Sequence, residues 1–275
     1  MPELPEVETT RRGIATIMPG HVLTRLIVHE TRMRWPIAPD LADKVANQIV
    51  LGCGRRGKYL LIHFNKGTQI IHLGMSGSLR RAPMDEARLK HDHVEWIFPH
   101  ARFLLHDPRR FGAVMWHDAD NGPVTNHPLL AGLGIEPFDP LFTGGYLHQG
   151  LKGKTQSIKQ ALLAGTIVVG VGNIYASEAL FRARINPKTA AGTISSGRCE
   201  RLAVAIRQTL EEALKSGGST LRDYVDAKGE PGAYFELFAA VYNRAQQPCR
   251  VCQTPIRRIV QGQRATYYCP RCQRV

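Results

Sequence analysis

Cys249-Arg250-Val251-Cys252 and Cys269-Pro270-Arg271-Cys272 are two C-x-x-C pairs near the end of the chain, with 16 residues between them. Each pair offers two thiolates, and a hairpin between the pairs would bring all four sulfurs together, so the spacing predicts a tetrahedral zinc site. Gly262 lies near the middle of this expected hairpin, whose strands we place at 256–260 and 266–268. Because four protein ligands fill the coordination sphere, one structural rather than catalytic Zn²⁺ is expected, held by Cys249, Cys252, Cys269 and Cys272.

Disulfide bonds are the competing interpretation of these cysteines. The chain begins with the acidic segment MPELPEVE, which lacks the apolar stretch of a secretory signal. A protein without an export signal keeps its thiols reduced, and this favours zinc. Two further cysteines, Cys53 and Cys199, have no metal-ligand spacing and are expected to be ordinary buried thiols.

The charge of the chain indicates a polyanionic partner. The 275 residues include 36 Lys+Arg and 23 Asp+Glu, a formal net charge of +13, and residues 249–275 contain six arginines and no acidic residue. This asymmetry favours nucleic acid, and a generally basic, solvated surface is the alternative. No stretch approaches the roughly 20 uninterrupted apolar residues of a membrane-spanning helix. A cytoplasmic protein with no membrane partner is therefore expected.

The N-terminal half has the pattern of a β-sandwich or barrel covered by one helix. Pro5 and the acidic residues after it are typical of the first turn of a helix, which we expect to end near Gly20. Short segments rich in Val, Ile, Leu, Phe and Trp, separated by turn residues, then predict strands at 22–29, 58–64, 68–73, 93–98, 102–106 and 113–117.

The C-terminal half changes to a helical period. Residues 119–150 contain many Gly, Pro and Asn, and 131–150 is predicted as a linker. The segment VGVGN at 169–173 lacks the third glycine of a dinucleotide fingerprint. We interpret it as a glycine turn with Asn173 as the N-cap of a helix, where backbone N–H groups could hold a phosphate. Apolar residues three and four positions apart predict helices at 157–164, 174–183, 199–216 and 233–244.

Pro2 is the unusual residue of the N-terminus. Removal of the initiator methionine would leave a secondary amine with a pKa of about 8, and its attack on an aldehyde-like carbon would give a positively charged iminium. Glu3 is adjacent and Glu6 lies about one helical turn further on, where each could act as a general acid or base. The alternative is that this segment is only a well-capped helix start.

The whole chain resembles the formamidopyrimidine-DNA glycosylases, the bacterial enzymes that excise oxidised purines. Seven motifs in order carry the resemblance, together with the cysteine spacing. They are MPELPEVET at 1–9, GKY at 57–59, HLGMSG at 72–77, KHDH at 90–93, DPRRFG at 107–112, VGVGNIY at 169–175 and QRAT at 263–266.

The resemblance implies an α+β multidomain fold. Its parts would be an N-terminal helix on a catalytic β-sandwich at 1–130, a helix–two-turns–helix DNA-binding domain at 151–245 and a four-cysteine zinc β-hairpin at 246–275. It also implies a bifunctional DNA glycosylase and AP lyase of base excision repair. Such an enzyme would act as a monomer, in the bacterial cytoplasm and on the nucleoid, with double-stranded DNA containing damaged bases as its partner.

The resemblance further implies catalytic roles. Pro2 would attack C1′ of the damaged nucleotide, with Glu3 as its acid/base partner and Glu6 assisting proton transfer. Lys58 would support β-elimination and grip a phosphate, and a solvated lysine at a strand end is the alternative. The family assigns the last proton transfer, in δ-elimination, to the arginine that matches Arg264. Because arginine stays protonated, we expect this side chain to act as a phosphate clamp.

A damaged base must be flipped out of the duplex before it can be excised. The resemblance implies that Met75, Arg109 and Phe111 fill the resulting void and that the Arg109 guanidinium bonds to the orphaned cytosine. By pattern alone, Met75 and Phe111 would more often be core residues. A polar loop at 217–235 would close over the flipped base, or it is a plain connector. Further DNA contacts are implied for His91, Arg109, Arg110, Lys154 and Asn173.

Two other functions stay open on sequence alone. The endonuclease VIII type shares the fold and the proline but prefers oxidised pyrimidines, and Leu4 together with the intact Met75, Arg109 and Phe111 set favours the purine branch. A non-enzymatic zinc-hairpin protein that binds DNA or RNA is the second alternative. Borohydride trapping on abasic-site DNA separates it from an enzyme, because only an enzyme with an amine nucleophile becomes covalently linked.

Overall fold

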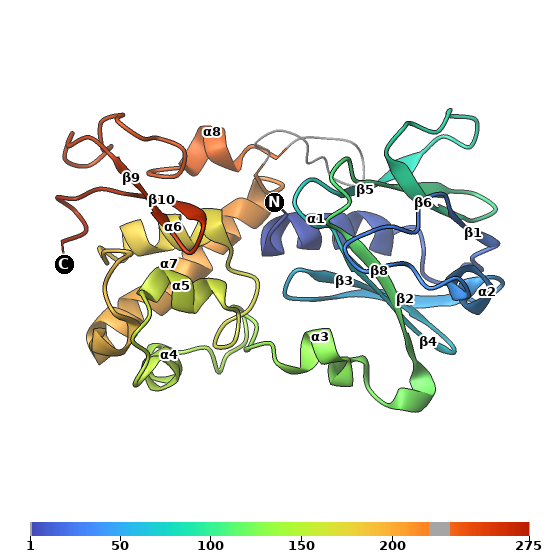
Figure 1. Cartoon of the computed structure of the whole chain (residues 1–275), viewed down its shortest axis with the longest axis horizontal. Helices are drawn as coiled ribbons and strands as arrows, with labels where there is room; N and C mark the ends of the chain where they lie inside the picture. The colour runs from blue at the N-terminus through green and yellow to red at the C-terminus, as the bar shows by residue number, and fades with distance from the viewer. Residues whose placement is uncertain (1, 220–231, 275) are drawn as a thin grey trace. The chain divides into compact units, whose positions relative to one another are not determined.

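The computed structural model describes residues 2–219 and 232–274, which fold into two compact units (Figure 1). Unit 1 comprises Met1–Ala131 and Leu214–Phe235, and unit 2 comprises Gly132–Ala213 and Glu236–Val275. Each unit is described by itself. The segment Leu214–Phe235 lies inside the helical domain predicted at 151–245 but belongs to the same unit as the N-terminal residues.

Unit 1 is built on a sandwich of two four-stranded antiparallel sheets. The first sheet has the order β1 (Arg25–Val28), β6 (Asp92–Ile97), β7 (Arg102–His106) and β5 (Ser78–Ala82). The second has the order β2 (Val50–Arg56), β3 (Tyr59–Phe64), β4 (Gly67–His72) and β8 (Ala113–Asp118). The predicted strands overlap six of these eight. The sequence missed β2 and β5, because glycines, arginines and serine replace the usual β-branched residues there.

The chain crosses from one sheet to the other at two turns, and these turns have to be neighbours. Residues 73–77 join β4 to β5, and residues 107–112 join β7 to β8. Because β4 pairs with β8 and β5 pairs with β7, both turns leave from the same ends of the paired strands. His72 lies opposite Ala113 and Ser78 lies opposite His106. We refer to 73–77 and 107–112 together as the crossover turns.

The first helix, α1 (Leu4–Ala15), covers the sandwich and buries Leu4, Val7 and Ile14. It begins where Pro5 predicted, but it ends at Ala15 rather than near Gly20. Pro19 explains the early end, because proline lacks an N–H donor and disfavours helical backbone in the residue before it. Two short helices, α2 (Leu41–Val45) and α3 (Pro128–Ala131), complete the regular helices in the N-terminal part of this unit.

Unit 2 is helical, and two of its helices differ from the sequence prediction. The predicted linker 131–150 contains most of α4 (Gly144–Leu151), whose first turn is capped by the Thr143 hydroxyl. The helix predicted at 233–244 is only the short α8 (Tyr234–Phe238), which starts at the end of unit 1. The other helices lie near their predicted positions, as α5 (Ile158–Leu163), α6 (Asn173–Arg182) and α7 (Ser196–Lys215).

The early end of α8 has a clear cause in the contacts of Glu178. This buried carboxylate of α6 accepts three backbone N–H bonds, from Ala240 at 2.8 Å, Val241 at 3.0 Å and Tyr242 at 2.7 Å. Those three N–H groups cannot also serve a continued helix, so the chain turns away after Phe238. Burial raises the pKa of Glu178, although these N–H bonds oppose the shift.

The C-terminal residues of unit 2 form the predicted hairpin, with strands β9 (Arg257–Gln261) and β10 (Arg264–Tyr268). Its turn is the two residues Gly262 and Gln263, which have φ of +51° and +62°. Positive φ at both central positions is the pattern of a type I′ turn, which matches the twist of the flanking strands. None of the helices in the described part of the chain combines the length and apolarity needed to cross a membrane.

Candidate functional site

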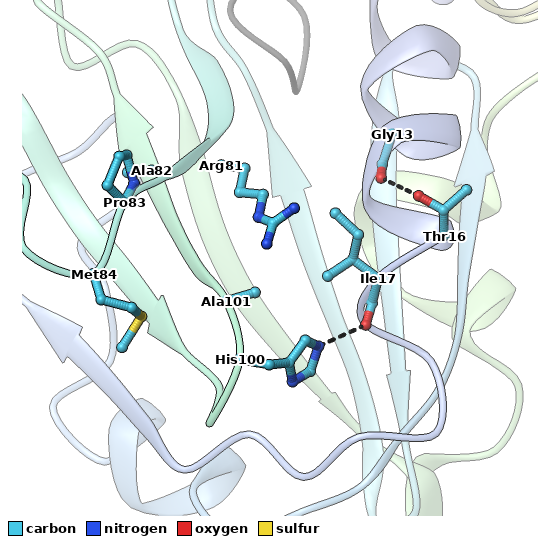
Figure 2. A pocket seen from close by; sticks show the side chains of 9 residues that line it. All are labelled: Gly13, Thr16, Ile17, Arg81, Ala82, Pro83, Met84, His100 and Ala101. Atoms are coloured by element: carbon cyan, nitrogen blue, oxygen red, sulfur yellow. Dashed lines mark hydrogen bonds between the residues drawn. The ribbon is translucent and has the colours of Figure 1, made fainter.

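A pocket of about 690 Å³ lies in unit 1, and its lining contains none of the residues predicted to carry chemistry (Figure 2). It is lined by the end of α1 and by segments 81–84 and 100–101. The ring of His100 is engaged there with the backbone oxygen of Ile17, and Arg81 supplies a cation. No carboxylate lines this pocket, so it lacks a general acid or base for glycosidic chemistry.

The predicted nucleophile and its acidic neighbours lie together at the N-terminus of α1. Pro2 is buried, and the side chains of Glu3 and Glu6 are each only 1% exposed. Glu3 is the N-cap of α1, with extended backbone, and its N–H donates to Oε2 of Glu6 at 2.7 Å. The positive end of the helix dipole favours carboxylates in this place. Pro2 therefore lies directly beside a buried, helix-capping carboxylate.

Glu6 is held by the segment that follows α7. Its Oε1 atom accepts the backbone N–H of Ser219 at 2.7 Å and the Ser219 hydroxyl at 2.9 Å. The approach is tight, since a Cβ on Gly218 would lie 2.9 Å from the same oxygen, and Gly218 has φ +87°. Sequence reasoning did not find this contact. Residues 220–231 of the loop predicted at 217–235 lie outside the described residues.

Substitution of Glu6 by glutamine tests this anchoring role. An amide group cannot accept from both Glu3 and Ser219, so one buried N–H loses its acceptor, at a cost of about 1–3 kcal/mol. We expect Glu6→Gln to lower the free energy of unfolding of unit 1 by that amount. Ser219→Ala is the matched control, because it removes one hydroxyl and keeps the backbone bond, and it should cost less. Denaturant titration followed by tryptophan fluorescence measures both, and equal stability of Glu6→Gln and the unsubstituted protein would refute the anchor.

Lys58 lies in the two-residue turn between β2 and β3, after Gly57 at φ +56°. Arg55 supports this turn, since its Nη1 donates to the Gly57 oxygen at 3.0 Å and its Nε lies 3.2 Å from Oε2 of Glu8. Burial raises the pKa of Glu8, but hydrogen bonds and charge from Arg11, Arg12 and Arg55 outweigh it and lower the pKa to about 2. Glu8 is thus an ionised link between α1 and the turn that carries Lys58.

His72, the last residue of β4, is a neutral imidazole close to Lys58. Its Nδ1 accepts the backbone N–H of Gly74 at 3.0 Å, so its remaining proton is on Nε2. Burial, together with the charges of Lys58 and Arg34, lowers the pKa of His72 to about 4. A protonated ring would lose its acceptor nitrogen and repel Lys58, so the neutral form preserves the first crossover turn.

The depressed pKa of His72 makes unit 1 sensitive to acid. The unfolded chain takes up this proton near pH 6.5 and the folded chain only near pH 4, so the stability contributed by the neutral ring is complete above pH 6.5 and falls as the pH drops toward 4. We expect a loss of about 2 kcal/mol between pH 7.5 and pH 5. Unfolding followed by tryptophan fluorescence at both pH values measures it. His72→Asn keeps an acceptor for Gly74 and should show a smaller loss; an identical loss would rule out His72 as the source.

The three side chains predicted to fill the void lie on the crossover turns. Met75 is 37% exposed and Phe111 is 41% exposed, although apolar residues of this kind are usually buried. The guanidinium of Arg109 stacks over the Phe111 ring at 4.7 Å from its centroid. Arg110 differs from its neighbour, because its Nη1 is paired with Glu30 at 3.1 Å. The exposed apolar pair and the stacked cation therefore form one surface of unit 1.

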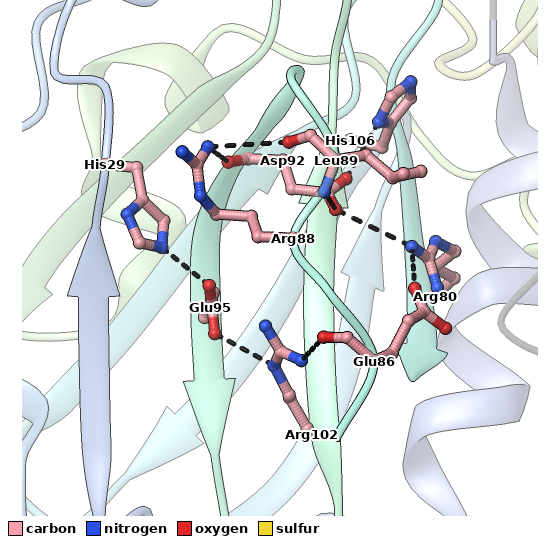
Figure 3. Close-up of polar contacts among 9 residues, drawn as sticks. All are labelled: His29, Arg80, Glu86, Arg88, Leu89, Asp92, Glu95, Arg102 and His106. Carbon is pink, nitrogen blue, oxygen red and sulfur yellow. Dashed lines mark hydrogen bonds and ion pairs between the residues drawn. The ribbon is translucent and has the colours of Figure 1, made fainter. Parts of the chain in front are cut away.

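His91 directly precedes β6, whose first residue, Asp92, belongs to the polar network that Figure 3 shows on the face of the sheet opposite the core. In that network Asp92 accepts from His106 at 2.8 Å and from the Leu89 N–H at 2.9 Å. Burial and the charges of His106, Lys90 and His93 lower the pKa of His91. These bonds fix the chain on either side of His91, whose ring is partly exposed.

In unit 2, Asn173 holds the hairpin instead of capping its helix. The N-cap of α6 is Gly172, and Asn173 is the first helical residue, so the predicted cap was wrong. The Nδ2 atom of Asn173 donates to the Tyr242 hydroxyl at 3.2 Å and to the Ala265 oxygen at 3.0 Å. A side-chain amide with partners in two other segments fixes their spacing, which a cap does not require.

Lys159 is a second anchor of the hairpin, and sequence reasoning missed it. This lysine of α5 is completely buried, and its Nζ donates to the Ala265 oxygen at 3.1 Å and to the Thr266 hydroxyl at 2.8 Å. A buried ammonium is costly without such acceptors. The signal in the sequence was a lysine inside the apolar stretch 158–163. Lys159 and Asn173 together position the residues that follow Arg264.

Arg264 and Lys154 are the remaining predicted DNA contacts of unit 2. Arg264 opens β10 directly after the type I′ turn, and its side chain is exposed. Lys154 is partly exposed in the connection between α4 and α5, after Gly153 at φ +71°. The side chains of both residues are therefore accessible to solvent.

The four cysteines of the hairpin form a group with the geometry of a zinc site. Their Sγ atoms all lie within 4.8 Å of one another, with 4.0 Å between Cys249 and Cys272 and 3.4 Å between Cys252 and Cys269. Sulfurs at the corners of a zinc tetrahedron are about 3.8 Å apart, since each Zn–S bond is about 2.3 Å. A disulfide requires about 2.05 Å, so that alternative fails. Among the described residues, this is the one His, Cys, Asp and Glu cluster with metal-ligand spacing.

Two backbone N–H groups support the thiolates of this cluster. The Val251 N–H donates to Sγ of Cys249, and the Cys272 N–H donates to Sγ of Cys269, each at 3.4 Å. Such bonds favour the deprotonated sulfur that binds zinc. The other two cysteines are different, because burial raises the pKa of Cys53 to about 12 and that of Cys199 to about 11. Cys199 is buried, as expected, whereas Cys53 is only partly buried.

Comparisons with known proteins cover the whole chain. Residues 1–114 match the formamidopyrimidine-DNA glycosylase N-terminal domain, residues 133–225 the formamidopyrimidine-DNA glycosylase H2TH domain, and residues 246–275 a zinc finger found in FPG and IleRS. The formamidopyrimidine-DNA glycosylase of Bordetella pertussis is 68% identical over 274 residues, which cover 100% of both chains.

Two crystal structures of Lactococcus lactis proteins are similar over essentially the whole chain. An FPG mutant in complex with a Fapy-dG-containing DNA has a TM-score of 0.92 and 32% identity, with 100% of both chains covered. The Fpg complex with an abasic-site-containing DNA has a TM-score of 0.91 and 31% identity, with 99% of this chain and 100% of the other covered.

Proposed function

The chain belongs to the formamidopyrimidine-DNA glycosylase family, and from this membership we propose that it excises 8-oxoguanine and formamidopyrimidines from duplex DNA through a Schiff base on Pro2. It is a DNA glycosylase of base excision repair with one structural zinc, and its partner is DNA. The observation that carries the proposal is the buried group of Pro2, Glu3 and Glu6 at the start of α1.

The nucleophile is the amine that Pro2 exposes once the initiator methionine is removed. Its lone pair attacks C1′, the bond from C1′ to the base breaks, and the sugar ring opens to leave an iminium on the proline nitrogen. Glu3, the next residue in the chain and the N-cap of α1, is assigned to move protons to and from the sugar. Glu6 fixes the chain around it through Ser219, and this holds the amine in a single orientation.

The iminium then permits strand cleavage. It acidifies the C2′ proton, whose departure expels the 3′ phosphate, and a second elimination expels the 5′ phosphate. Lys58 is the cation of unit 1 assigned to the first elimination and to its phosphate. The turn that carries it is tied to α1 through Arg55 and Glu8. Arg264 is assigned to the 5′ side as a phosphate clamp.

Base flipping is assigned to the crossover turns. Exposed Met75 and Phe111 are suited to enter the stack, because they lose unfavourable contact with water when they do so. Arg109 offers planar N–H donors to the orphaned cytosine. We assign contacts with the DNA backbone to His91, Arg110, Lys154 and Asn173. For Arg110 this requires release of its ion pair with Glu30, and a contact through the amide of Asn173 requires release of one of its bonds to Tyr242 and Ala265. The zinc ion holds the hairpin together and takes part in no chemical step.

The test of this function compares two damaged duplexes. One carries 8-oxoguanine opposite cytosine and the other carries thymine glycol opposite adenine, and single-turnover excision is measured on both. The proposal predicts faster excision of 8-oxoguanine, and a preference for thymine glycol would assign the endonuclease VIII type specificity instead. We further propose that the enzyme acts as a monomer in the cytoplasm, which sedimentation of the enzyme–DNA complex and localisation of a tagged chain would test.

A further inference from the structure

Asp107 links the two crossover turns through a fully buried carboxylate. The side chain is 0% exposed. Its Oδ1 accepts the Ser76 hydroxyl at 3.1 Å, and its Oδ2 accepts the backbone N–H of Gly112 at 2.7 Å. Ser76 belongs to the turn that carries Met75, and Gly112 follows Phe111 in the other turn. One carboxylate therefore bonds to both turns, one through each oxygen.

The backbone of Asp107 extends this link to the segment around His91. Its N–H donates to the His91 oxygen at 2.9 Å, and its own oxygen accepts from Nε2 of His93 at 2.9 Å and from the Arg110 N–H at 3.1 Å. His91 and Arg110 are thus bonded directly to Asp107, while Met75 and Phe111 are each next in sequence to a residue that is. Asp107 itself does not reach the surface.

The two turns also pack against each other with no spare room. A Cβ on Gly74 would lie 2.5 Å from the Gly112 nitrogen and 2.5 Å from the Phe111 carbonyl carbon, and Gly74 has φ +66°. Because the backbones are in contact, any change in the bonds of Asp107 shifts Met75 and Phe111 relative to each other. Burying a carboxylate costs desolvation free energy. An aspartate at position 107 is therefore better explained by the hydrogen bonds with which it fixes the two turns than by the space that it fills.

We propose that Asp107 is the positioning residue that holds Met75, Arg109 and Phe111 as one rigid wedge, and that it thereby sets the efficiency of base flipping and the reading of the opposite base. This rests on the proposed function. A loosened wedge should slow reactions that require flipping out of a duplex. It should not slow cleavage at an abasic site in single-stranded DNA, where no partner strand has to be separated and no void has to be filled.

The experiment measures three rates for each variant under single-turnover conditions. They are excision of 8-oxoguanine opposite cytosine, excision of 8-oxoguanine opposite adenine, and cleavage of an abasic site in single-stranded DNA. For Asp107→Ala we expect excision of 8-oxoguanine opposite cytosine to fall about 10-fold, because the hydrogen bonds of the carboxylate to both turns are lost. Cleavage of the abasic site in single-stranded DNA should stay within about 2-fold. The ratio of the first two rates should move toward one, because Arg109 no longer meets the opposite base in a fixed position.

Three further variants make the test specific. Ser76→Ala breaks only the link to the first turn and should change the rates in the same direction by less. Asp107→Asn can still accept from Gly112 while its amide donates to Ser76, so it should restore most of the lost activity. Glu95→Gln is the control, since it alters another buried carboxylate, whose hydrogen-bond partners among the described residues are His29 and Arg102 on the far face of the sheet.

The outcomes are distinct. The proposal is overturned if Asp107→Ala slows excision from the duplex and cleavage of the single strand equally. It is also overturned if the ratio of the 8-oxoguanine excision rates opposite cytosine and opposite adenine does not change. If Asp107→Ala does not fold, an unchanged ratio of duplex to single-strand rates in Ser76→Ala overturns it equally. Failure of the unsubstituted protein to excise 8-oxoguanine or to cleave the abasic site would instead be a failure of the proposed function.

Discussion

Insertion of one alanine between Met1 and Pro2 is expected to lower 8-oxoguanine excision and abasic-site cleavage by on the order of 10³-fold. The Pro2 nitrogen becomes an amide, whose lone pair is delocalised and cannot form an iminium. The new chain-end amine lies one residue, about 3.8 Å, further from Glu3. Borohydride trapping on abasic-site DNA, followed by mapping of the linked peptide, measures the change directly.

Pro2→Gly is the matched control for this insertion. It keeps an amine at the same position beside Glu3 but replaces a secondary amine with a primary one. An imine formed on glycine must be protonated before it attracts electrons, so an intermediate loss is expected. The linked peptide of the unsubstituted enzyme should be the N-terminal one. Linkage at Lys58, or full activity of the inserted chain, would contradict the assignment of Pro2.

Loss of zinc is expected to reduce affinity for damaged DNA by about 100-fold or more while unit 1 stays folded. The apolar cluster at the hairpin is small, with Phe181, Val241, Ile256 and Tyr267 as its buried members besides two of the cysteines, so the metal supplies much of the folding free energy of the hairpin. Without it, the type I′ turn and Arg264 lose their fixed position, and the exposed arginines of the hairpin are no longer held in place for contact with phosphate. Binding to an abasic-site duplex before and after treatment with a chelator measures this loss.

Tryptophan fluorescence provides the control for unit 1. Trp35, Trp96 and Trp116 are the three tryptophans of the chain and all lie in Met1–Ala131. Their emission should not change when zinc is removed. Cys272→Ser should reproduce the effect of the chelator, and Cys53→Ser, which alters a cysteine outside the cluster, should bind DNA normally. Full affinity of Cys272→Ser, or unfolding of unit 1 on zinc removal, would show that this division of roles is mistaken.

Local patterns predicted much of the fold. Strands β3, β4, β6, β7 and β8 were found within a residue or two at each end, because segments rich in Val, Ile, Leu, Phe and Trp between turn residues are typical of buried strands. The sequence predictions were wrong where a contact with a distant residue, and not the local helix or strand preference, determined the backbone conformation. The helix predicted at 233–244 ends at Phe238, because Glu178 takes up the next backbone N–H groups.

In the candidate site, too, some features follow local sequence patterns and others depend on contacts between distant residues. The pattern of apolar residues favoured Met75 and Phe111 as core residues, whereas both are exposed on turns that the pairing of β4 with β8 and of β5 with β7 brings together. Asn173 has the residue type of a helix cap, but its side-chain amide bonds to the hairpin. In each case the contacting residues are far apart in the sequence, so a short segment does not contain both of them.

Local sequence patterns predicted the four clustered cysteines of the zinc site, the change from β to helical segments, and Pro2 with its neighbouring carboxylate as the proposed nucleophile. Each of these depends on residue types a few positions apart. Three contacts follow only from the three-dimensional fold: Ser219 anchors Glu6, Lys159 holds the hairpin, and Asp107 joins the two crossover turns. The physical reason is that a buried polar side chain must find a partner within hydrogen-bond distance, and topology alone determines which distant residue is there.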